Sequence, residues 1–383
     1  MKNFFSNSAV RETLRIVLAV GAALLLGFIV TLIVSEDPIG AYKAFLFGPL
    51  SKFNRFGDWI EESLTLILVG LSVAIAFKAN QFSLGAEGQI YLGALVSGSI
   101  ALFLPVPGII RIPLALLAAM TIGFLWGWIP GYLKAHLDAN EIVSTLMFNF
   151  IAIKLYDYFL IFQIKPDNAG YNASDFFPKE GVLPSFFFKL PFAEELRTMF
   201  VNQTNITIML YIMIAAFIGG YYLMFRTPFG YQLRMIGANI KFARYGGINT
   251  KSTIILAFAV SGIFAGLAGA HLSMGIHTKL IANISMGLGF EGIVVATMAR
   301  NNPLFIPISG LAYGYLRAGA DVMERSSDVS REMVLVIQAI IILLVTAERI
   351  LPVVQQRIQD RKENNENGNG SGEQALEGGK NAS

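Results

Sequence analysis

The stretch Asn80–Gln89, N-Q-F-S-L-G-A-E-G-Q, interrupts an apolar region that extends from Trp59 to Leu104. A glutamate at membrane depth is costly unless it lines a polar path or has a partner. A shorter copy of the motif, L-G-F-E-G, recurs at Leu288–Gly292. Two such elements, one in each half of the chain, predict an internal repeat whose helices are broken beside a solute pathway, as in transporters.

The composition is that of a membrane protein. Hydrophobic residues make up 54% of the chain and charged residues only 14%, and the mean hydropathy is +0.58. A soluble domain carries about 25% charged residues. The net charge of +3 is too small to indicate a nucleic-acid partner, and the absence of cysteine excludes disulfides and thiolate metal sites.

We predict an all-α polytopic membrane protein with about ten transmembrane spans of roughly 20 residues each. The predicted spans lie near residues 16–34, 59–78, 82–104, 112–134, 140–162, 206–225, 252–272, 285–300, 303–320 and 332–350. Two five-span halves then run in opposite directions. Because the two glutamate motifs open the third and eighth spans, they would be related by inverted topology.

The segment 226–251 sets the predicted orientation. It is rich in basic residues and has no acidic one, with Arg226, Arg234, Lys241, Arg244 and Lys251. The positive-inside rule places it in the cytoplasm. Both termini are then cytoplasmic, with a short segment at 1–15 and a largely disordered tail at 351–383, and the transmembrane domain occupies 16–350. The loop at 163–205 is expected outside.

Polar side chains near the broken helices are predicted to line the solute pathway: Asn80, Ser83, Glu87, Gln89, Asn149 and Glu291. Glycine allows the backbone to unwind, and a helix N-terminus offers free N–H groups to a polar solute. The two glutamates have a second interpretation, as struts that hold the broken helices, and the sequence leaves both open. Asn140 is expected to be a helix N-cap.

Glycines spaced four residues apart predict close helix packing. They form the pairs Gly123/Gly127, Gly127/Gly131, Gly262/Gly266 and Gly310/Gly314.

No catalytic residue, metal ligand or cofactor site is predicted in this chain. The three histidines lack metal-ligand spacing, and neither a nucleophile elbow nor a phosphate-binding loop occurs. An intramembrane enzyme therefore has little support. An ion-coupled secondary transporter, with Glu87 or Glu291 as the ion site, remains the alternative to a transporter driven by a separate ATPase.

Three motifs carry a family resemblance: F-S-L-G-A-E-G-Q-I-Y-L-G-A-L at 82–95, A-N-E-I-V-S-T-L-M-F-N-F-I-A at 139–152, and R-M-I-G-A-N-I-K-F-A-R-Y-G-G-I at 234–248. Over roughly residues 60–350 the chain resembles the membrane permeases of ABC importers in the branched-chain amino-acid and simple-sugar superfamily, most closely the nucleoside-type branch.

The resemblance implies an alternating-access pore made of two related permeases, often non-identical. ATP and Mg would be held by a separate ATPase, and an extracellular lipoprotein would deliver the solute. A nucleoside is the implied cargo, with sugars and riboflavin as alternatives.

The resemblance also implies that part of the basic segment contacts the ATPase. Pro228–Ile248 has a short helical pattern broken at Gly237 and ends in two glycines, which suits a helix that docks in a groove. The implied coupling residues are Gly237, Ala238, Asn239, Ala243, Arg244, Gly246 and Gly247. The alternative is that the basic charges only fix the topology.

Overall fold

The computed structural model describes residues 24–166, 169–185, 204–337 and 339–340. The chain forms two compact units, residues 43–325 and residues 1–42 together with 326–383, and each is described by itself. The predicted terminal segments 1–15 and 351–383 lie outside the described residues, as does part of the predicted loop 163–205.

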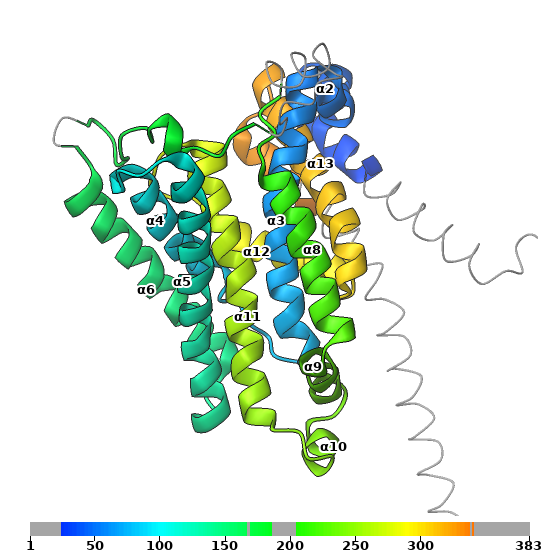
Figure 1. Cartoon of the computed structure of the whole chain (residues 1–383). Helices are drawn as coiled ribbons and strands as arrows, with labels where there is room; N and C mark the ends of the chain where they lie inside the picture. Colours follow the sequence, from blue (N-terminus) through cyan, green and yellow to red (C-terminus); the bar gives the residue numbers. More distant parts are fainter. Residues whose placement is uncertain (1–23, 167–168, 186–203, 338, 341–383) are drawn as a thin grey trace, which may run out of the picture. The chain divides into compact units, whose positions relative to one another are not determined.

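Within the described ranges the chain is helical, apart from turns and two isolated bridges. The long helices are α2 (Pro38–Ser51), α3 (Phe53–Lys78), α4 (Ala86–Phe103), α5 (Gly108–Leu137), α6 (Glu141–Phe159), α8 (Met209–Arg226), α9 (Pro228–Ala238), α11 (Thr250–His271), α12 (Leu288–Met298) and α13 (Ile306–Ser326), and α10 (Ile240–Tyr245) is a short helix (Figure 1). Two π-helical segments, Leu160–Ile164 and Leu272–His277, extend α6 and α11.

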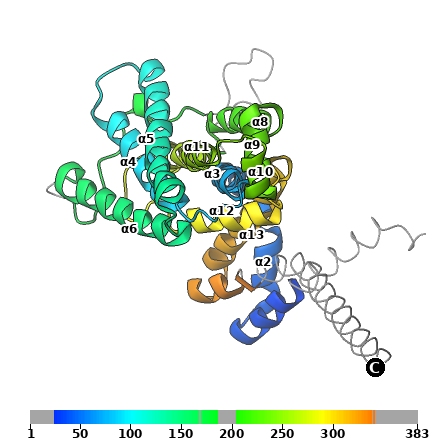
Figure 2. The same cartoon turned by 90° about the horizontal axis from the view of Figure 1, so that it is seen from below.

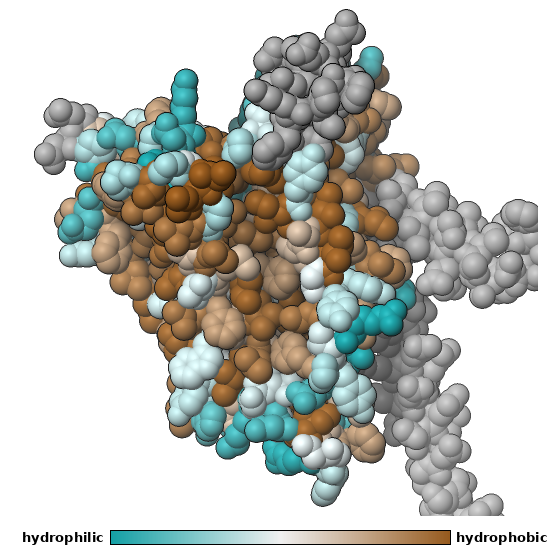
Figure 3. Space-filling view, viewed as in Figure 1, coloured by the Kyte–Doolittle hydropathy of each residue, from teal (hydrophilic) through white to brown (hydrophobic). Residues whose placement is uncertain are grey.

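The helices α3 and α11 form the centre of the larger unit. Viewed along their axes, they lie between α4, α5 and α6 on one side and α8, α9 and α10 on the other (Figure 2). Both are apolar around most of their circumference and mostly buried, as expected for central helices. By contrast, α5 and α6 expose large apolar side chains such as Leu117 and Phe150. The resulting apolar surface fits a lipid environment (Figure 3).

Among the described residues, six helices are long and apolar enough to cross a membrane, and they match six of the predicted spans. They are Phe53–Lys78, Ala86–Phe103, Gly108–Leu137, Glu141–Ile164, Met209–Arg226 and Thr250–His277. Near 285–300 the structure differs from the prediction, because α12 has only 11 residues. At 1.5 Å per residue, a helix of this length covers about half of the hydrocarbon core.

Glycines allow α5 and α11 to approach each other closely. A Cβ atom added to Gly123 would lie 2.0 Å from the carbonyl oxygen of Gly262, and one added to Gly127 would lie 2.3 Å from that of Phe258. On α13, Gly314 leaves no room for a Cβ atom beside Ser63 of α3. These contacts confirm the packing role predicted for the spaced glycines.

In the smaller unit, Asp328 ties two distant parts of the chain together. Its Oδ1 accepts a hydrogen bond from Ser35 Oγ at 2.6 Å, and its Oδ2 accepts one from the backbone N–H of Glu36 at 2.6 Å. The exposed carboxylate thus fixes the end of the helix Leu24–Val34 to the segment that follows α13.

Candidate functional site

The two glutamate motifs meet in the structure. Each lies in the first turn of a helix, α4 for Glu87 and α12 for Glu291. The Glu87 carboxylate accepts hydrogen bonds from the backbone N–H groups of Gly289 at 2.7 Å and Gly287 at 3.1 Å. It thereby satisfies two of the free N–H groups at the start of α12. Glu87 is 5% exposed, so these bonds form in a largely dehydrated setting.

The turn that precedes α4 is held by two side chains of α6. Asn149 accepts a hydrogen bond from the N–H of Gly88 at 2.9 Å and donates one to the carbonyl of Leu84 at 2.7 Å. Thr145 Oγ1 accepts from the N–H of Leu84 at 3.1 Å. Both α6 side chains are buried, so they hold the broken backbone in place of the missing helical hydrogen bonds.

The remaining polar residues around α4 have different surroundings. Ser83 is buried and its Oγ accepts from the N–H of Gly85. Asn80 is exposed and has a left-handed backbone, with φ of 55°. Gln89 is buried against Gly127 of α5, and its Oε1 accepts no hydrogen bond from the described part of the chain.

Glu291 belongs to a different polar cluster. Its Oε2 lies 2.5 Å from Nη1 of Arg317 on α13. Nε of the same arginine lies 3.6 Å from Oε2 of Glu62 on α3. The three side chains are partly buried and join α12, α13 and α3 through charge. A solute role for any of these residues stays a prediction.

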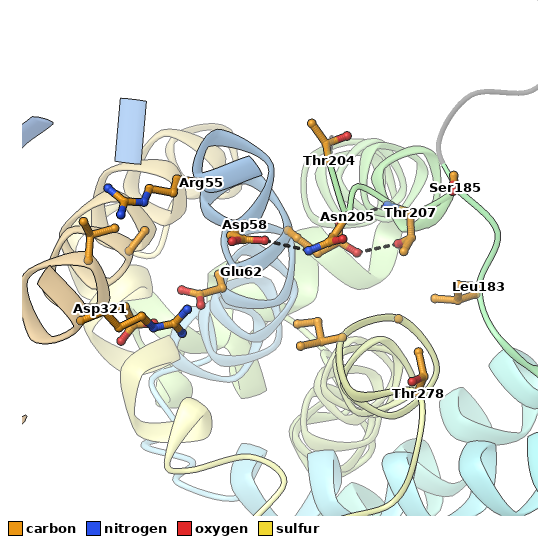
Figure 4. A pocket seen from close by; sticks show the side chains of 16 residues that line it. Arg55, Asp58, Glu62, Leu183, Ser185, Thr204, Asn205, Thr207, Thr278 and Asp321 are labelled. Carbon is orange, nitrogen blue, oxygen red and sulfur yellow. Dashed lines mark hydrogen bonds between the residues drawn. The ribbon is translucent and has the colours of Figure 1, made fainter. Parts of the chain in front are cut away.

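A polar cavity lies at the start of α3, at the end of this helix away from Lys78. It has a volume of about 610 Å3. Figure 4 shows Asp58 and Glu62 of α3 near Asp321 of α13, while Asn205 and Thr207 are hydrogen-bonded to α3, Asn205 to Asp58 at 3.0 Å and Thr207 to Glu61 at 2.7 Å.

A buried network forms part of the wall of this cavity. Glu61 Oε1 lies 2.8 Å from Nε2 of His271 and accepts from Thr207 Oγ1 at 2.7 Å. Nδ1 of the imidazole lies 2.8 Å from Thr65 Oγ1. His271 is fully buried, and its ring holds α11 to α3 through Thr65 and Glu61.

At the opposite end of α3, the basic segment forms α9 and α10 (Figure 1). The helical pattern breaks at Asn239 rather than at Gly237, because the Asn239 side chain caps α10 by accepting from the N–H groups of Lys241 and Phe242 at 3.0 Å. Gly247 ends the segment with a φ of 80°.

The predicted coupling residues fall into two groups. Ala238, Asn239, Arg244, Gly246 and Gly247 are exposed. Ala243 is buried against α11 beside Ile254 and Phe258. Gly237 packs inside the chain, since a Cβ atom there would lie 2.0 Å from the Lys78 carbonyl oxygen. A bulky residue at 237 would therefore disturb the fold, whatever binds outside.

Sequence reasoning missed several polar residues of the larger unit: Glu61, Glu62, Thr145, Thr207, His271 and Arg317. A signal was present for three of them, because Glu61, Glu62 and Arg317 are charged residues inside predicted spans. Asn140 was predicted correctly, since its Oδ1 caps α6 through the N–H groups of Ile142 and Val143.

Comparison with known proteins identifies the class to which these helices and motifs belong. Residues 56–346 match the family model described as branched-chain amino acid transport system, permease component. The chain belongs to this family. It is a multi-pass membrane protein and a permease subunit of an ABC importer, not an enzyme.

Several permeases are similar to this chain along most of their length. The glucose ABC transporter permease protein TsgB13 of Haloferax volcanii is 30% identical, with 87% of each chain covered. The guanosine ABC transporter permease protein NupP of Bacillus subtilis is 28% identical over 91% of this chain and 97% of its own. The nucleoside permease protein NupB of Lactococcus lactis is 28% identical over 91% and 94%. No solved structure matches the chain.

Proposed function

We propose that this chain is the permease subunit of an ATP-driven importer that moves a nucleoside across the cell membrane by alternating access. The choice of a nucleoside as cargo is supported by the similarity to NupP and NupB, which extends over nine-tenths of the chain. The glucose permease is similar to the same degree, so a sugar is the competing cargo.

The transporter is proposed to work as an assembly. A separate ATPase holds ATP and Mg, a second related permease completes the pore, and an extracellular lipoprotein delivers the solute. We further propose that the two glutamate motifs belong to inverted halves, and that both termini and the segment 226–251 lie in the cytoplasm. The basic charge of that segment supports this orientation.

The hydrogen bonds at the start of α12 suggest how the pore would move. Glu87 holds two N–H groups of α12, while Glu291 on the same helix is paired with Arg317 of α13. The helix α12 is therefore tied at neighbouring points to two different helices. Alternating access requires such elements to have two arrangements, and we place the pivot at this junction.

Uptake measurements test the proposal directly. Proteoliposomes with the complete complex should accumulate labelled nucleoside only with ATP, and should continue after the proton gradient is dissipated. Omitting the ATPase should abolish uptake. Uptake that stops when the gradient is dissipated at constant ATP would instead favour the ion-coupled transporter, with Glu87 or Glu291 as the ion site. If unlabelled glucose inhibited this uptake more strongly than unlabelled nucleosides do, the cargo would be a sugar and not a nucleoside.

The ATPase contact is proposed to centre on α10. This helix exposes Phe242 by 62% and Tyr245 by 92%, beside Lys241 and Arg244. Exposed aromatic residues flanked by arginine are typical of interface residues that dominate binding energy. Because they do not pack inside the chain, they are better test positions than Gly237.

Replacing Phe242 and Tyr245 together by alanine should remove a docking surface without disturbing the fold. We expect ATPase binding to weaken by at least about 2 kcal/mol, roughly thirtyfold, as measured by co-purification and solute-stimulated ATP hydrolysis. Phe176→Ala is the matched control, because Phe176 is 67% exposed but lies in the segment predicted to be outside. If the double variant bound the ATPase as well as the unaltered chain does, the proposed contact at α10 would be wrong. The basic charges of 226–251 would then only fix the topology.

A further inference from the structure

We propose that the cavity at the start of α3 is a binding site for a neutral, hydroxyl-rich small solute. The inference rests on the proposed transport function, and it assigns a solute site at the end of the molecule opposite α9 and α10. The site lies apart from the glutamate motifs that the sequence singled out.

The cavity has the size and construction of a small-molecule site. Its volume of about 610 Å3 falls within the range of about 300–1,000 Å3 that is usual for such sites. The start of α3, the segment before α8, the end of α11 and α13 each contribute to the wall. Residues distant in sequence thus converge on one hollow (Figure 4).

The neutral part of the lining suits a solute with several hydroxyl groups. Ser185, Thr204, Thr278 and the amide oxygen of Asn205 can take part in hydrogen bonds with a neutral polar molecule, whereas the Thr207 hydroxyl already donates to Glu61 and accepts from the N–H of Met209. The apolar residues Leu183, Ile276 and Val322 provide contact surface between them. This mixture of apolar surface with a few polar groups is typical of solute sites.

The charged part of the lining favours a neutral solute that carries hydrogen-bond donors. Arg55 and Arg325 share the wall with four carboxylates, Asp58, Glu61, Glu62 and Asp321, of which Glu61 is paired with His271 and Glu62 lies beside Arg317. An ion of either sign would therefore meet like charges, which is costly away from bulk water. Ionised carboxylates only accept hydrogen bonds, so they are suited to hydroxyl groups of the solute.

Two carboxylates of the wall are held in place from behind. Glu61 is fixed by Thr207 and His271. Glu62 has Arg317 behind it, and its Oε2 accepts no hydrogen bond from the described residues, although Nε of Arg317 lies 3.6 Å away. A distance of 3.6 Å is too long for a hydrogen bond. Because Oε2 is itself buried, contact of Glu62 with a solute would be made by Oε1.

The cavity also connects to the junction of the glutamate motifs. Arg317 contacts both Glu62 in the cavity wall and Glu291 on α12. The first turn of α12 is in turn held by Glu87. A solute bound in the cavity would thus lie at the outer end of a line of polar groups that leads to the proposed pivot.

Protection of single cysteines tests this assignment, and the chain contains no cysteine of its own. Thr278→Cys and Ser185→Cys place a thiol in the wall. Asp175→Cys is the matched control, because Asp175 is exposed but does not line the cavity. It is close to Thr278, since the N–H of Phe177, two residues further on, donates a hydrogen bond to the carbonyl of Thr278. The complete reconstituted complex is treated with an impermeant thiol reagent in the presence of uridine, glucose, uridine monophosphate, leucine or putrescine.

We expect a neutral solute to slow labelling of both wall cysteines about tenfold at about ten times its dissociation constant, and to leave the control unchanged. Protection by glucose but not by uridine would support the cavity as a solute site and would rule out a nucleoside as the cargo. Strongest protection by the nucleotide, the amino acid or the diamine would overturn the inference. Equal labelling under all conditions, or no reaction at either wall position, would also overturn it. ATP dependence of uptake is a separate readout and tests only the proposed function.

Discussion

Glu87 and Glu291 occupy the same position in two copies of one motif, yet their surroundings differ. Glu87 is almost fully buried and binds backbone N–H groups of another helix. Glu291 is one-quarter exposed and pairs with the guanidinium group of Arg317. The first carboxylate caps a helix start, and the second takes part in an ion pair.

The difference shows that a repeated motif can mark the start of a helix without fixing the partner of its side chain. Both copies place a glutamate in the first turn, although α4 starts at Ala86, after the first motif glycine, and α12 starts at Leu288, before it. What each carboxylate meets depends on the neighbouring helix. Here α12 presents free N–H groups to Glu87, whereas α13 presents a cation to Glu291.

The largest effect should follow removal of the Glu87 carboxylate. Glu87→Ala would leave the N–H groups of Gly287 and Gly289 without an acceptor, at about 1–3 kcal/mol for each buried group. Glu87→Gln retains one acceptor oxygen and should lose less. Thermal unfolding of the purified protein, followed by tryptophan fluorescence, measures both. Equal stability of the alanine variant and the unaltered chain would rule out a bracing role for Glu87.

A smaller effect is expected from the corresponding first glycines of the motifs. Gly289→Ala should destabilise by about 1–3 kcal/mol, because its Cβ would lie 2.4 Å from the backbone nitrogen of Glu87. Gly85→Ala is the matched control, since the nearest atom to its Cβ, on Thr145, is 3.4 Å away. Folded yield and melting temperature separate the two variants. Similar losses at both positions would mean that the starts of α4 and α12 are equally crowded.

The smallest effect should be the coupling between Glu291 and Arg317. In a double-mutant cycle of Glu291→Gln and Arg317→Gln, we expect an interaction energy of about 1 kcal/mol, because the pair is partly exposed. A cycle of Glu87→Gln with Arg317→Gln should be closer to additive. Coupling that is larger in the second cycle than in the first would reverse the distinction between the two glutamates.

Much of the architecture followed from the sequence alone. Long apolar stretches predicted the six helices of the described residues that are long enough to cross a membrane, and glycine spacing predicted the close approach of α5 and α11. Asn140 was recognisable as a cap because its role depends only on the residues next to it. These features are local, so hydropathy and spacing are sufficient to find them.

The tertiary structure alone decided which side chains meet. The helix α12 proved too short to span, and Gly237, expected to face a partner, packs on Lys78 of its own chain. The cavity wall joins Glu61 to Thr207 and His271, which are 146 and 210 residues away. Hydropathy records how deeply a residue is buried, whereas hydrogen bonds and ion pairs depend on distances across helix interfaces, which the order of residues along one helix does not contain.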